Sequence, residues 1–409
     1  MSSPDRRTFI AGSAAGAIAL GAPAVHALGA NEKLTIGLIG SGNRGRTISQ
    51  ECVKAGHNVV AVADIAKFRH DFIIEKLAEV KGPKPALYDD YRKLLEHQGL
   101  DAVIIATPDH HHKEHLLAAM AADKHAYCEK PLSHTIEQGK EMVAAVRKAK
   151  KIVQVGNQRH SGEHWARARD VVQSGDFGDL VWVKVWDCRN WIKRDPFAPP
   201  KTFDAAQQKG VNWDGFLGTA KKVPFDPVRY WAWRWYWDYA GGLITDIGAH
   251  QLDIVQWISG VDMPKSVTAN GGTYFFKHWE TPDVGHGVWD YGKFTATFAV
   301  EFVNGFDGVG ATFYGTKQTL HCDAEGTIKL FETIDKFVPT MKPKAEWAVP
   351  NETGAHVRNW LSAVKDNKDP SSPIELGHRV ATAAHLANIA YRTGKKVVWD
   401  AKKELIVEK

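Results

Sequence analysis

The chain has 409 residues, of which 44% are hydrophobic and 24% charged, and its formal net charge at pH 7 is +5. This length exceeds one ordinary domain, and the composition is that of a soluble globular protein. Lysine and arginine are scattered instead of forming a basic stripe, which argues against nucleic acid as a partner. No segment after residue 30 has the roughly 18 unbroken apolar residues of a membrane helix.

Residues 1–30 have the composition of an export signal. The pair Arg6-Arg7 precedes a weakly apolar stretch, residues 10–22, and small residues such as Ala24 and Ala27 offer cleavage positions. This pattern resembles a twin-arginine signal, which implies export to the periplasm by the twin-arginine machinery after folding in the cytoplasm. The stretch is too short and too poor in Leu and Ile for a stable membrane anchor. A disordered basic tail is the alternative.

The four cysteines form no C-x-x-C pair, and folding in the cytoplasm takes place in a reducing compartment. We therefore expect buried free thiols, while one late disulfide stays open. The four are Cys52, Cys128, Cys188 and Cys322.

Residues 31–157 alternate short apolar runs with segments of helical length. Nearly continuous apolar runs are typical of parallel strands that are covered on both faces. The alternation predicts an α/β fold with a doubly wound parallel sheet, that is, a Rossmann domain. The predicted strands are residues 33–40, 58–64, 101–107, 125–129 and 151–155, and the predicted helices are residues 46–55, 111–122 and 135–149.

Residues 158–409 have a different pattern, which predicts an α+β domain with a large, mostly antiparallel sheet. One face of this sheet needs cover from a helix or from another subunit, which favours a homodimer or homotetramer. The helices within residues 355–393 could pack back on the Rossmann domain. The predicted strands are residues 181–186, 266–274, 293–302 and 308–314, and the predicted helices are residues 355–366 and 376–393.

A glycine-rich loop follows the first strand directly and opens a helix. Its first glycine permits the tight turn, the second lets the backbone approach a pyrophosphate, and the third lets the helix pack on the strand. Asp64 ends the second strand, where an acid binds both ribose hydroxyls and repels a 2′-phosphate, so NAD is favoured over NADP. Lys67 and Arg69 nearby weaken that preference. The loop comprises Gly40, Ser41, Gly42, Asn43, Arg44 and Gly45.

Three further motifs stand in order along the chain. They are ATPDHHH at residues 106–112, EKPL at residues 129–132 and GGLITDIGAHQLD at residues 241–253. With the glycine loop they resemble the glucose–fructose oxidoreductase and inositol dehydrogenase family, Gfo/Idh/MocA, from about residue 33 to the C-terminus. The resemblance implies an NAD-dependent oxidoreductase that acts on CH–OH groups of a sugar, cyclitol or sugar derivative.

The catalytic residues that the resemblance implies are Lys130, Asp246 and His250. Asp246 and His250 are four residues apart and would share one face of a helix, which Asp253 would continue. An imidazole suits proton transfer near neutral pH, and Asp246 could orient it or hold a substrate hydroxyl. The Lys130 ammonium, at the end of a parallel strand, could hold the reacting oxygen and stabilise developing negative charge.

Further residues match family positions beside the nicotinamide half of the cofactor: Thr107, Pro108, His112, Glu129 and Asn157. Aromatic residues are frequent within residues 186–239. Their faces could bind sugar rings, or they could equally pack a core or a subunit interface. The candidate substrate-binding residues are Gln158, Arg159, Trp213, Arg229 and Trp233.

The adjacent histidines also invite a metal-binding interpretation, because His111 and His115 are four residues apart. No carboxylate or cysteine completes a recognisable ligand set, and hydride transfer to NAD needs no metal. We therefore expect no metal, but a helix capped by Asp109 with solvated histidines.

Export restricts the catalytic cycle, because the periplasm holds no free NAD pool. The preferred function is therefore hydride transfer between a tightly bound NAD and a carbohydrate-like substrate. One alternative is a redox-neutral enzyme that modifies or cleaves a glycoside by oxidation, elimination and re-reduction. The other is a sugar-binding protein without catalysis.

Overall fold

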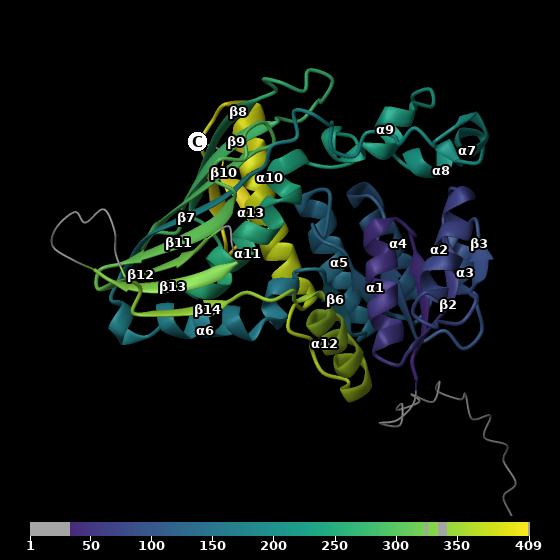
Figure 1. Cartoon of the computed structure of the whole chain (residues 1–409), viewed down its shortest axis with the longest axis horizontal. Coiled ribbons are helices and arrows are strands. Elements are labelled where there is room, and N and C mark those ends of the chain that lie inside the picture. Colours follow the sequence, from purple (N-terminus) through teal and green to yellow (C-terminus); the bar gives the residue numbers. More distant parts are fainter. Residues whose placement is uncertain (1–32, 324–325, 334–341, 408–409) are drawn as a thin grey trace, which may run out of the picture. The chain divides into compact units, whose positions relative to one another are not determined.

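The computed structural model describes residues 33–323, 326–333 and 342–407 (Figure 1). The predicted twin-arginine signal at residues 1–30 lies outside the described residues. Within the described ranges, none of the helices has the length and apolar character needed to cross a bilayer. All four cysteines are buried and unpaired, as expected.

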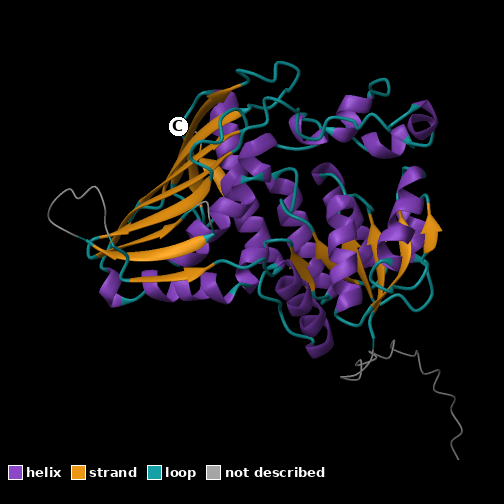
Figure 2. Ribbon diagram, in the orientation of Figure 1, coloured by secondary structure: helices purple, strands orange, loops and turns teal. Residues whose placement is uncertain are grey.

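The first half of the chain forms a six-stranded parallel sheet with the order β3-β2-β1-β4-β5-β6 (Figure 2). This confirms the predicted Rossmann sheet, whose strand order reverses between β1 and β4 and leaves a crevice at the carboxyl ends. The strands are β1 (Thr35–Ile39), β2 (Asn58–Ala63), β3 (Ala86–Tyr88), β4 (Ala102–Ile105), β5 (His125–Cys128) and β6 (Val153–Val155).

Helices cover both faces of this sheet, which explains why β4 is buried along its whole length. They are α1 (Asn43–Lys54), α2 (Phe68–Ala78), α3 (Tyr91–Leu95), α4 (Asp109–Ala121) and α5 (Ile136–Ala149). The elements α2, α3 and β3 were not predicted from the sequence. The strand β3 has three residues at the sheet edge, two of them exposed, so it leaves no apolar run to detect.

The second half forms a ten-stranded sheet with the order β14-β13-β12-β11-β7-β10-β9-β8-β15-β16. Its neighbouring strands are antiparallel except for β7 and β10, which confirms the predicted mostly antiparallel sheet. The strands are β7 (Leu180–Cys188), β8 (Ser266–Gly272), β9 (Val284–Asp290), β10 (Thr295–Glu301), β11 (Val309–Gly315), β12 (Gln318–Cys322), β13 (Thr327–Glu332), β14 (Ala345–Ala348), β15 (Val397–Asp400) and β16 (Leu405–Val407).

Helices α11 and α13 pack on one face of this second sheet. Helix α13 also packs on the Rossmann helix α5, and α12 packs on α1. The helices and short 3₁₀ turns are η1 (Gln158–Ser161), α6 (Glu163–Val172), η2 (Gly175–Phe177), α10 (Gly242–Asp246), α11 (Gly248–Ser259), α12 (Thr353–Asp366) and α13 (Ile374–Thr393).

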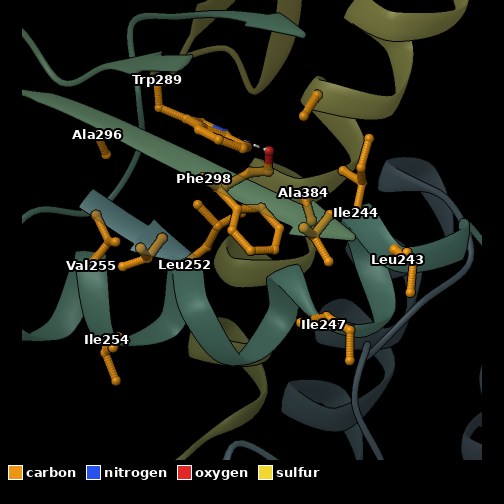
Figure 3. Close-up of a cluster of buried hydrophobic side chains, with 14 of the residues drawn as sticks. Leu243, Ile244, Ile247, Leu252, Ile254, Val255, Trp289, Ala296, Phe298 and Ala384 are labelled. Carbon is orange, nitrogen blue, oxygen red and sulfur yellow. Dashed lines mark hydrogen bonds between the residues drawn. The ribbon is translucent and has the colours of Figure 1, made fainter. Parts of the chain in front are cut away.

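Helix α11 is fixed by a buried apolar cluster (Figure 3). Leu252 and Val255 face the sheet beside Phe298 of β10, and all three are at most 2% exposed. The indole of Trp289 adds a hydrogen bond, in which Nε1 donates to the Ala383 carbonyl at 2.9 Å. This packing holds the first turn of α11, where His250 lies, in a defined position.

The long connection between β7 and α10 returns to the Rossmann domain. Within it, residues 203–219, here called the cover segment, contain α7 (Ala205–Lys209) and α8 (Trp213–Leu217), and α9 (Pro227–Trp231) and η3 (Trp233–Trp235) follow. Val211 forms a β-bridge with Ala66 just beyond β2. The Asn212 amide donates to the Ile65 carbonyl at 2.9 Å. The cover segment therefore lies against the end of the parallel sheet where the crevice opens.

Candidate active site

A large cavity of about 800 Å³ lies at the carboxyl ends of the parallel strands. Its volume is within the range of sites that hold cofactors and small ligands. The cavity is also lined by α10, α11 and the cover segment, so both halves of the chain build it. The predicted site residues that line it are Gly40, Gly42, Asn43, Arg44, Asp64, Thr107, Pro108, Glu129, Lys130, Gln158, Trp233, Asp246 and His250.

The glycine loop has the geometry that a pyrophosphate needs. Gly40 has a φ of +88°, and a Cβ there would lie 2.9 Å from the Ala106 carbonyl oxygen. A Cβ at Gly45 would lie 2.1 Å from the Gly40 carbonyl oxygen, so only glycine lets α1 approach this closely. A Cβ at Gly42 would meet no atom within 4 Å, and no side chain caps the start of α1. Free N–H groups thus face open space, which fits a bound phosphate.

Asp64 is held beside this loop at the end of β2. Its Oδ2 accepts hydrogen bonds from the Ser41 amide and hydroxyl, both at 2.8 Å, and its Oδ1 accepts from the Ala66 amide at 2.9 Å. A carboxylate has about four lone-pair sites, so these three bonds leave one, on Oδ1, for a ribose hydroxyl. Arg69 also lines the cavity, with its guanidinium 4.8 Å from the centroid of the Trp231 ring.

Lys130 and Asp246 join the two halves of the chain inside the cavity. The Lys130 Nζ donates to the Asp246 Oδ1 at 2.7 Å and to the Asp246 carbonyl oxygen at 2.8 Å. Burial acts to raise the pKa of Asp246, but the charges of Lys130 and Arg234 outweigh it and hold that pKa well below its ordinary value. Asp246 is therefore an ionised carboxylate that fixes the ammonium of Lys130.

His250 lies in the first turn of α11 and lines the same cavity. Asp246 ends α10, so the two residues stand on consecutive helices and not on the single helix that we predicted. No hydrogen bond joins these two described side chains, because the Asp246 carboxylate is directed to cations. Burial and the charges of Lys130 and Arg159 lower the pKa of His250 well below its ordinary value, so its imidazole is neutral.

Asp109 is a third carboxyl group in this part of the cavity, and sequence analysis assigned it wrongly. It does not cap α4, whose N-cap is Pro108. Its side chain instead lines the cavity and is 3% exposed. Burial and the nearby Asp246 carboxylate raise the pKa of Asp109 well above its ordinary value. A capping role was predicted because Asp is common at helix starts, whereas the position of this side chain depends on α10 far along the chain.

Replacement of Asp109 by asparagine is expected to raise the Tm by about 1–3 °C at pH 7. The native carboxyl keeps its proton to a higher pH than the unfolded one, so the carboxyl costs stability as the pH rises above its unfolded pKa. The effect should shrink as the pH falls and vanish below the unfolded pKa of 3.8, where both states are protonated. Thermal unfolding of wild-type and variant protein with matched NAD content measures both values, and a variant with a lower Tm at pH 7 would contradict this interpretation.

The histidines near the start of α4 are buried, so the prediction that they are solvated is wrong. His110, His111, His112 and His115 are each less than a tenth exposed. The cover segment buries the first two, whose Nε2 groups both donate to the Phe216 carbonyl oxygen, at 2.8 and 2.7 Å. In the described part of the chain, no cluster of three or more His, Cys, Asp or Glu side chains is arranged to hold a metal ion.

Several predicted site residues lie behind the cavity wall. Both ring nitrogens of His112 face backbone oxygens, those of Pro131 and Thr107, each at 2.9 Å. Asn157 and Arg159 donate to carbonyls of the first turn of α11, those of Ala249 and His250, at 3.3 and 3.1 Å. They therefore position that turn. The predicted residues absent from the cavity lining are Ser41, Gly45, His112, Asn157, Arg159, Trp213 and Arg229.

Asp253 was predicted to continue the helix face of Asp246 and His250, but its side chain does not face the cavity. It is 1% exposed, and its Oδ1 lies 2.6 Å from the His160 Nε2, in a buried pair away from the cavity. The interruption between α10 and α11 changes which side chains share a face, so spacing counted from Asp246 does not carry over to Asp253.

Some of the aromatic residues pack in the core, and others line the cavity, where their faces could bind a sugar ring. Trp235 and Tyr239 are fully buried in the core. Trp213 is absent from the cavity lining and stacks behind it on the lining residue Phe216. Other aromatic rings line the cavity together with several arginines. The lining residues that sequence analysis did not select include Arg69, Asp109, Arg189, Trp191, Phe197, Tyr230, Trp231, Arg234 and Phe302. The abundance of aromatic residues next to arginines in residues 186–239 could have indicated those members of the set that lie in this segment, but not Arg69, Asp109 or Phe302.

Comparison with known proteins agrees with this geometry. Residues 34–157 match the family model described as "Oxidoreductase family, NAD-binding Rossmann fold", and residues 219–321 match the model described as "GFO/IDH/MocA C-terminal domain". The chain carries both domains of the Gfo/Idh/MocA family. The resemblance seen in the four motifs is thereby confirmed, and residues 34–157 are an NAD-binding domain.

Individual relatives of this Gfo/Idh/MocA chain are distant. A myo-inositol 2-dehydrogenase from Thermotoga maritima is 27% identical over 240 residues, which are 58% of this chain and 58% of that protein. An alpha-N-acetylgalactosaminidase from Shewanella oneidensis is 30% identical over 155 residues, which are 37% of this chain and 34% of that protein. The chain thus spans little more than half, or less, of these curated relatives.

Solved structures share the fold over nearly the whole chain. A levoglucosan dehydrogenase in complex with NADH and levoglucosan superposes with a TM-score of 0.69 at 18% identity, covering 90% of this chain and 99% of that one. An oxidoreductase domain protein from Kribbella flavida has a TM-score of 0.70 at 21% identity, covering 92% and 100%. At such identities the likeness establishes the fold of this Gfo/Idh/MocA chain.

Proposed function

We propose that this protein is an NAD-dependent oxidoreductase that transfers hydride between a tightly bound NAD and a CH–OH group of a sugar, cyclitol or sugar derivative. The observation that carries the proposal is that the glycine loop, Lys130, Asp246 and His250 line one cavity. Relatives of matching fold are named as dehydrogenases of inositol and levoglucosan, which supports the substrate class.

The chain's own groups are placed for acid–base work beside a carbinol. The chemistry that NAD supplies when bound is acceptance of a hydride from the carbinol carbon. His250, neutral and without a hydrogen bond to a described side chain, takes the hydroxyl proton. An ammonium has three N–H donors, and Lys130 spends two of them on Asp246, so one remains for the reacting oxygen. In the reverse direction His250 returns the proton.

Tight retention of the cofactor is the second part of the proposal. The cover segment contributes Asn212, Gly215 and Phe216 to the cavity lining, and main-chain bonds tie it to residues just beyond β2. Release of a cofactor from the cavity would require these hydrogen bonds of the cover segment to break. Such retention would suit an enzyme exported with its cofactor, and we propose a periplasmic location on the strength of the Arg6-Arg7 signal.

Purified full-length protein tests the function directly. We expect it to keep about one equivalent of NAD through gel filtration, identified by mass spectrometry after denaturation. Adding a panel of sugars and cyclitols without free NAD should then raise the absorbance at 340 nm in a single turnover. Protein that keeps no nicotinamide but turns over added NAD would contradict retention. Protein that binds a sugar with no change at 340 nm would contradict catalysis and leave the sugar-binding alternative.

A second candidate function is glycoside cleavage without net redox change. The match to an alpha-N-acetylgalactosaminidase over 155 residues favours it. In that case a glycoside would be cleaved while the bound cofactor returns to its starting state, so product analysis would show a free sugar with no lasting change at 340 nm. A keto sugar formed together with reduced cofactor would instead support the oxidoreductase.

A further inference from the structure

The substrate side of the cavity contains an arginine whose side chain is held by aromatic rings but whose N–H groups lack a full set of hydrogen-bond acceptors. Arg234 lies in η3 and lines the cavity, and its side chain is 24% exposed. Its guanidinium lies over two rings, 4.2 Å from the centroid of Trp233 and 4.5 Å from that of Phe197. Stacking of this kind fixes the plane of the guanidinium and leaves its N–H edge free to bind.

The contact of Arg234 with Asp246 does not account for this arrangement. The Arg234 Nε lies 3.4 Å from the Asp246 Oδ2, which is longer than the roughly 2.7–2.9 Å of a charge-assisted hydrogen bond. Within the described residues, neither terminal nitrogen of Arg234 donates a hydrogen bond. An arginine that served only to orient Asp246 would be expected to direct its N–H fork at that carboxylate.

The backbone beside this arginine is also strained. Phe197 has a φ of +63°, in the left-handed region that aromatic residues rarely adopt. Residues held in such a conformation gather at ligand sites. The strained backbone places the Phe197 ring over the guanidinium of Arg234.

The charges on this side of the cavity leave one cation in excess. Asp246 is shared between Lys130 and Arg234. Two further lining arginines have their own carboxylates: Arg189 is paired with Asp187 through bonds of 2.6 and 2.7 Å, and Arg44 is paired with Glu129. Asp109, which lines the cavity near Asp246, is kept in its protonated form by burial and by Asp246, which raise its pKa. The single Asp246 carboxylate therefore faces two cations, and an anionic group of the substrate would balance the second one.

We propose that the substrate is a sugar acid, whose carboxylate binds the free N–H edge of Arg234 while its ring lies against Trp191 and Trp233. Both tryptophans line the cavity. A carboxylate is an acceptor-only group of one negative charge, which suits a single fork and a single excess cation. A phosphate would carry close to two charges and call for a second cation. This inference rests on the proposed function and names the substrate class of the same site.

The test compares matched acid and neutral sugars on the full-length holoprotein. D-Glucuronate and D-gluconate are paired with D-glucose, and D-galacturonate with D-galactose. We expect the value of kcat/KM for the acid to exceed that of its neutral partner at least tenfold in one or more pairs. Arg234→Gln should reduce this acid-to-neutral ratio to about one, and Arg234→Lys should restore part of it. Arg194→Gln is the control, since Arg194 is exposed, lies over Trp191 and is absent from the lining.

A binding measurement separates this inference from the proposed function. The Kd of each sugar, followed by tryptophan fluorescence, should show the same preference and the same loss in Arg234→Gln, with or without turnover. Acid binding that depends on Arg234 but causes no change at 340 nm would support the sugar-acid site and contradict the oxidoreductase. Equal binding of every pair, a ratio unchanged in Arg234→Gln, or a preference for glucose 6-phosphate over every acid would overturn the sugar-acid assignment.

Discussion

Replacement of His250 by asparagine is expected to lower kcat by about a hundred- to ten-thousand-fold. Asparagine occupies a similar volume and keeps a polar end, but it cannot take the proton of the substrate hydroxyl. The variant should keep its bound NAD, because the glycine loop and Asp64 lie on the Rossmann half of the cavity. Single-turnover reduction at 340 nm measures the rate, and the absorbance of released cofactor measures retention.

The pH dependence should identify the same group. Because the pKa of His250 is held well below its ordinary value of 6.5, oxidation should be constant near neutral pH and fall only in acid, with an apparent pKa below 6.5. That acid limb should be missing in His250→Asn. The matched control is His286→Asn, on the exposed face of β9, which should stay within twofold of wild type. A His250→Asn enzyme with near-normal kcat would rule out the proton-transfer role.

Acid is expected to destabilise the fold strongly between pH 6.5 and pH 4. Burial lowers the pKa of many described histidines, and in His356 and His385 it falls from 6.5 to about 4. The unfolded chain takes up these protons near pH 6.5 and the native protein does not, so stability is lost as the pH falls. Each of the two should contribute a loss of roughly 2 kcal/mol between pH 8 and pH 5. The full set is His57, His110, His111, His112, His115, His125, His134, His250, His321, His356, His378 and His385.

Urea unfolding at several pH values measures this loss as a falling midpoint with an unchanged slope. His385→Gln offers a sharper test, because glutamine can keep the bond to the Ser133 carbonyl, which His385 Nε2 donates at 2.9 Å, but cannot titrate. The free energy of unfolding of this variant should change less with pH than that of wild type, by an amount equivalent to about one proton fewer taken up on unfolding. His286→Gln should show no such difference. A midpoint that stays constant from pH 8 to pH 5 would contradict the buried neutral state of these histidines.

The parts of the site that sequence predicted well depend on short stretches of chain. The glycine loop is recognisable because the close contact that requires glycine at Gly45, with the Gly40 carbonyl oxygen, lies within the first strand, turn and helix. Lys130 follows a strand end directly, and Asp246 and His250 stand in one motif. Residues that act through their immediate neighbours leave a local pattern, and such patterns were sufficient here.

The errors concern residues whose surroundings come from distant segments. Asp109 was predicted to cap a helix, and His110 and His111 to be solvated, but the cover segment and α10 bury all three. Asp253 was predicted to face the site, but it pairs with His160 instead. Nothing within a few residues of these positions indicates which segment will cover them.

By itself, the sequence determined the parallel sheet, the mostly antiparallel second sheet, the dinucleotide loop and the presence of Lys130, Asp246 and His250. Only the tertiary structure decided which side chains face the cavity, since that depends on a segment about a hundred residues from α4 folding back over it. The protonated Asp109 and the stacked Arg234 exist for the same reason. Burial and charge act through space, and the order of residues along the chain does not record those distances.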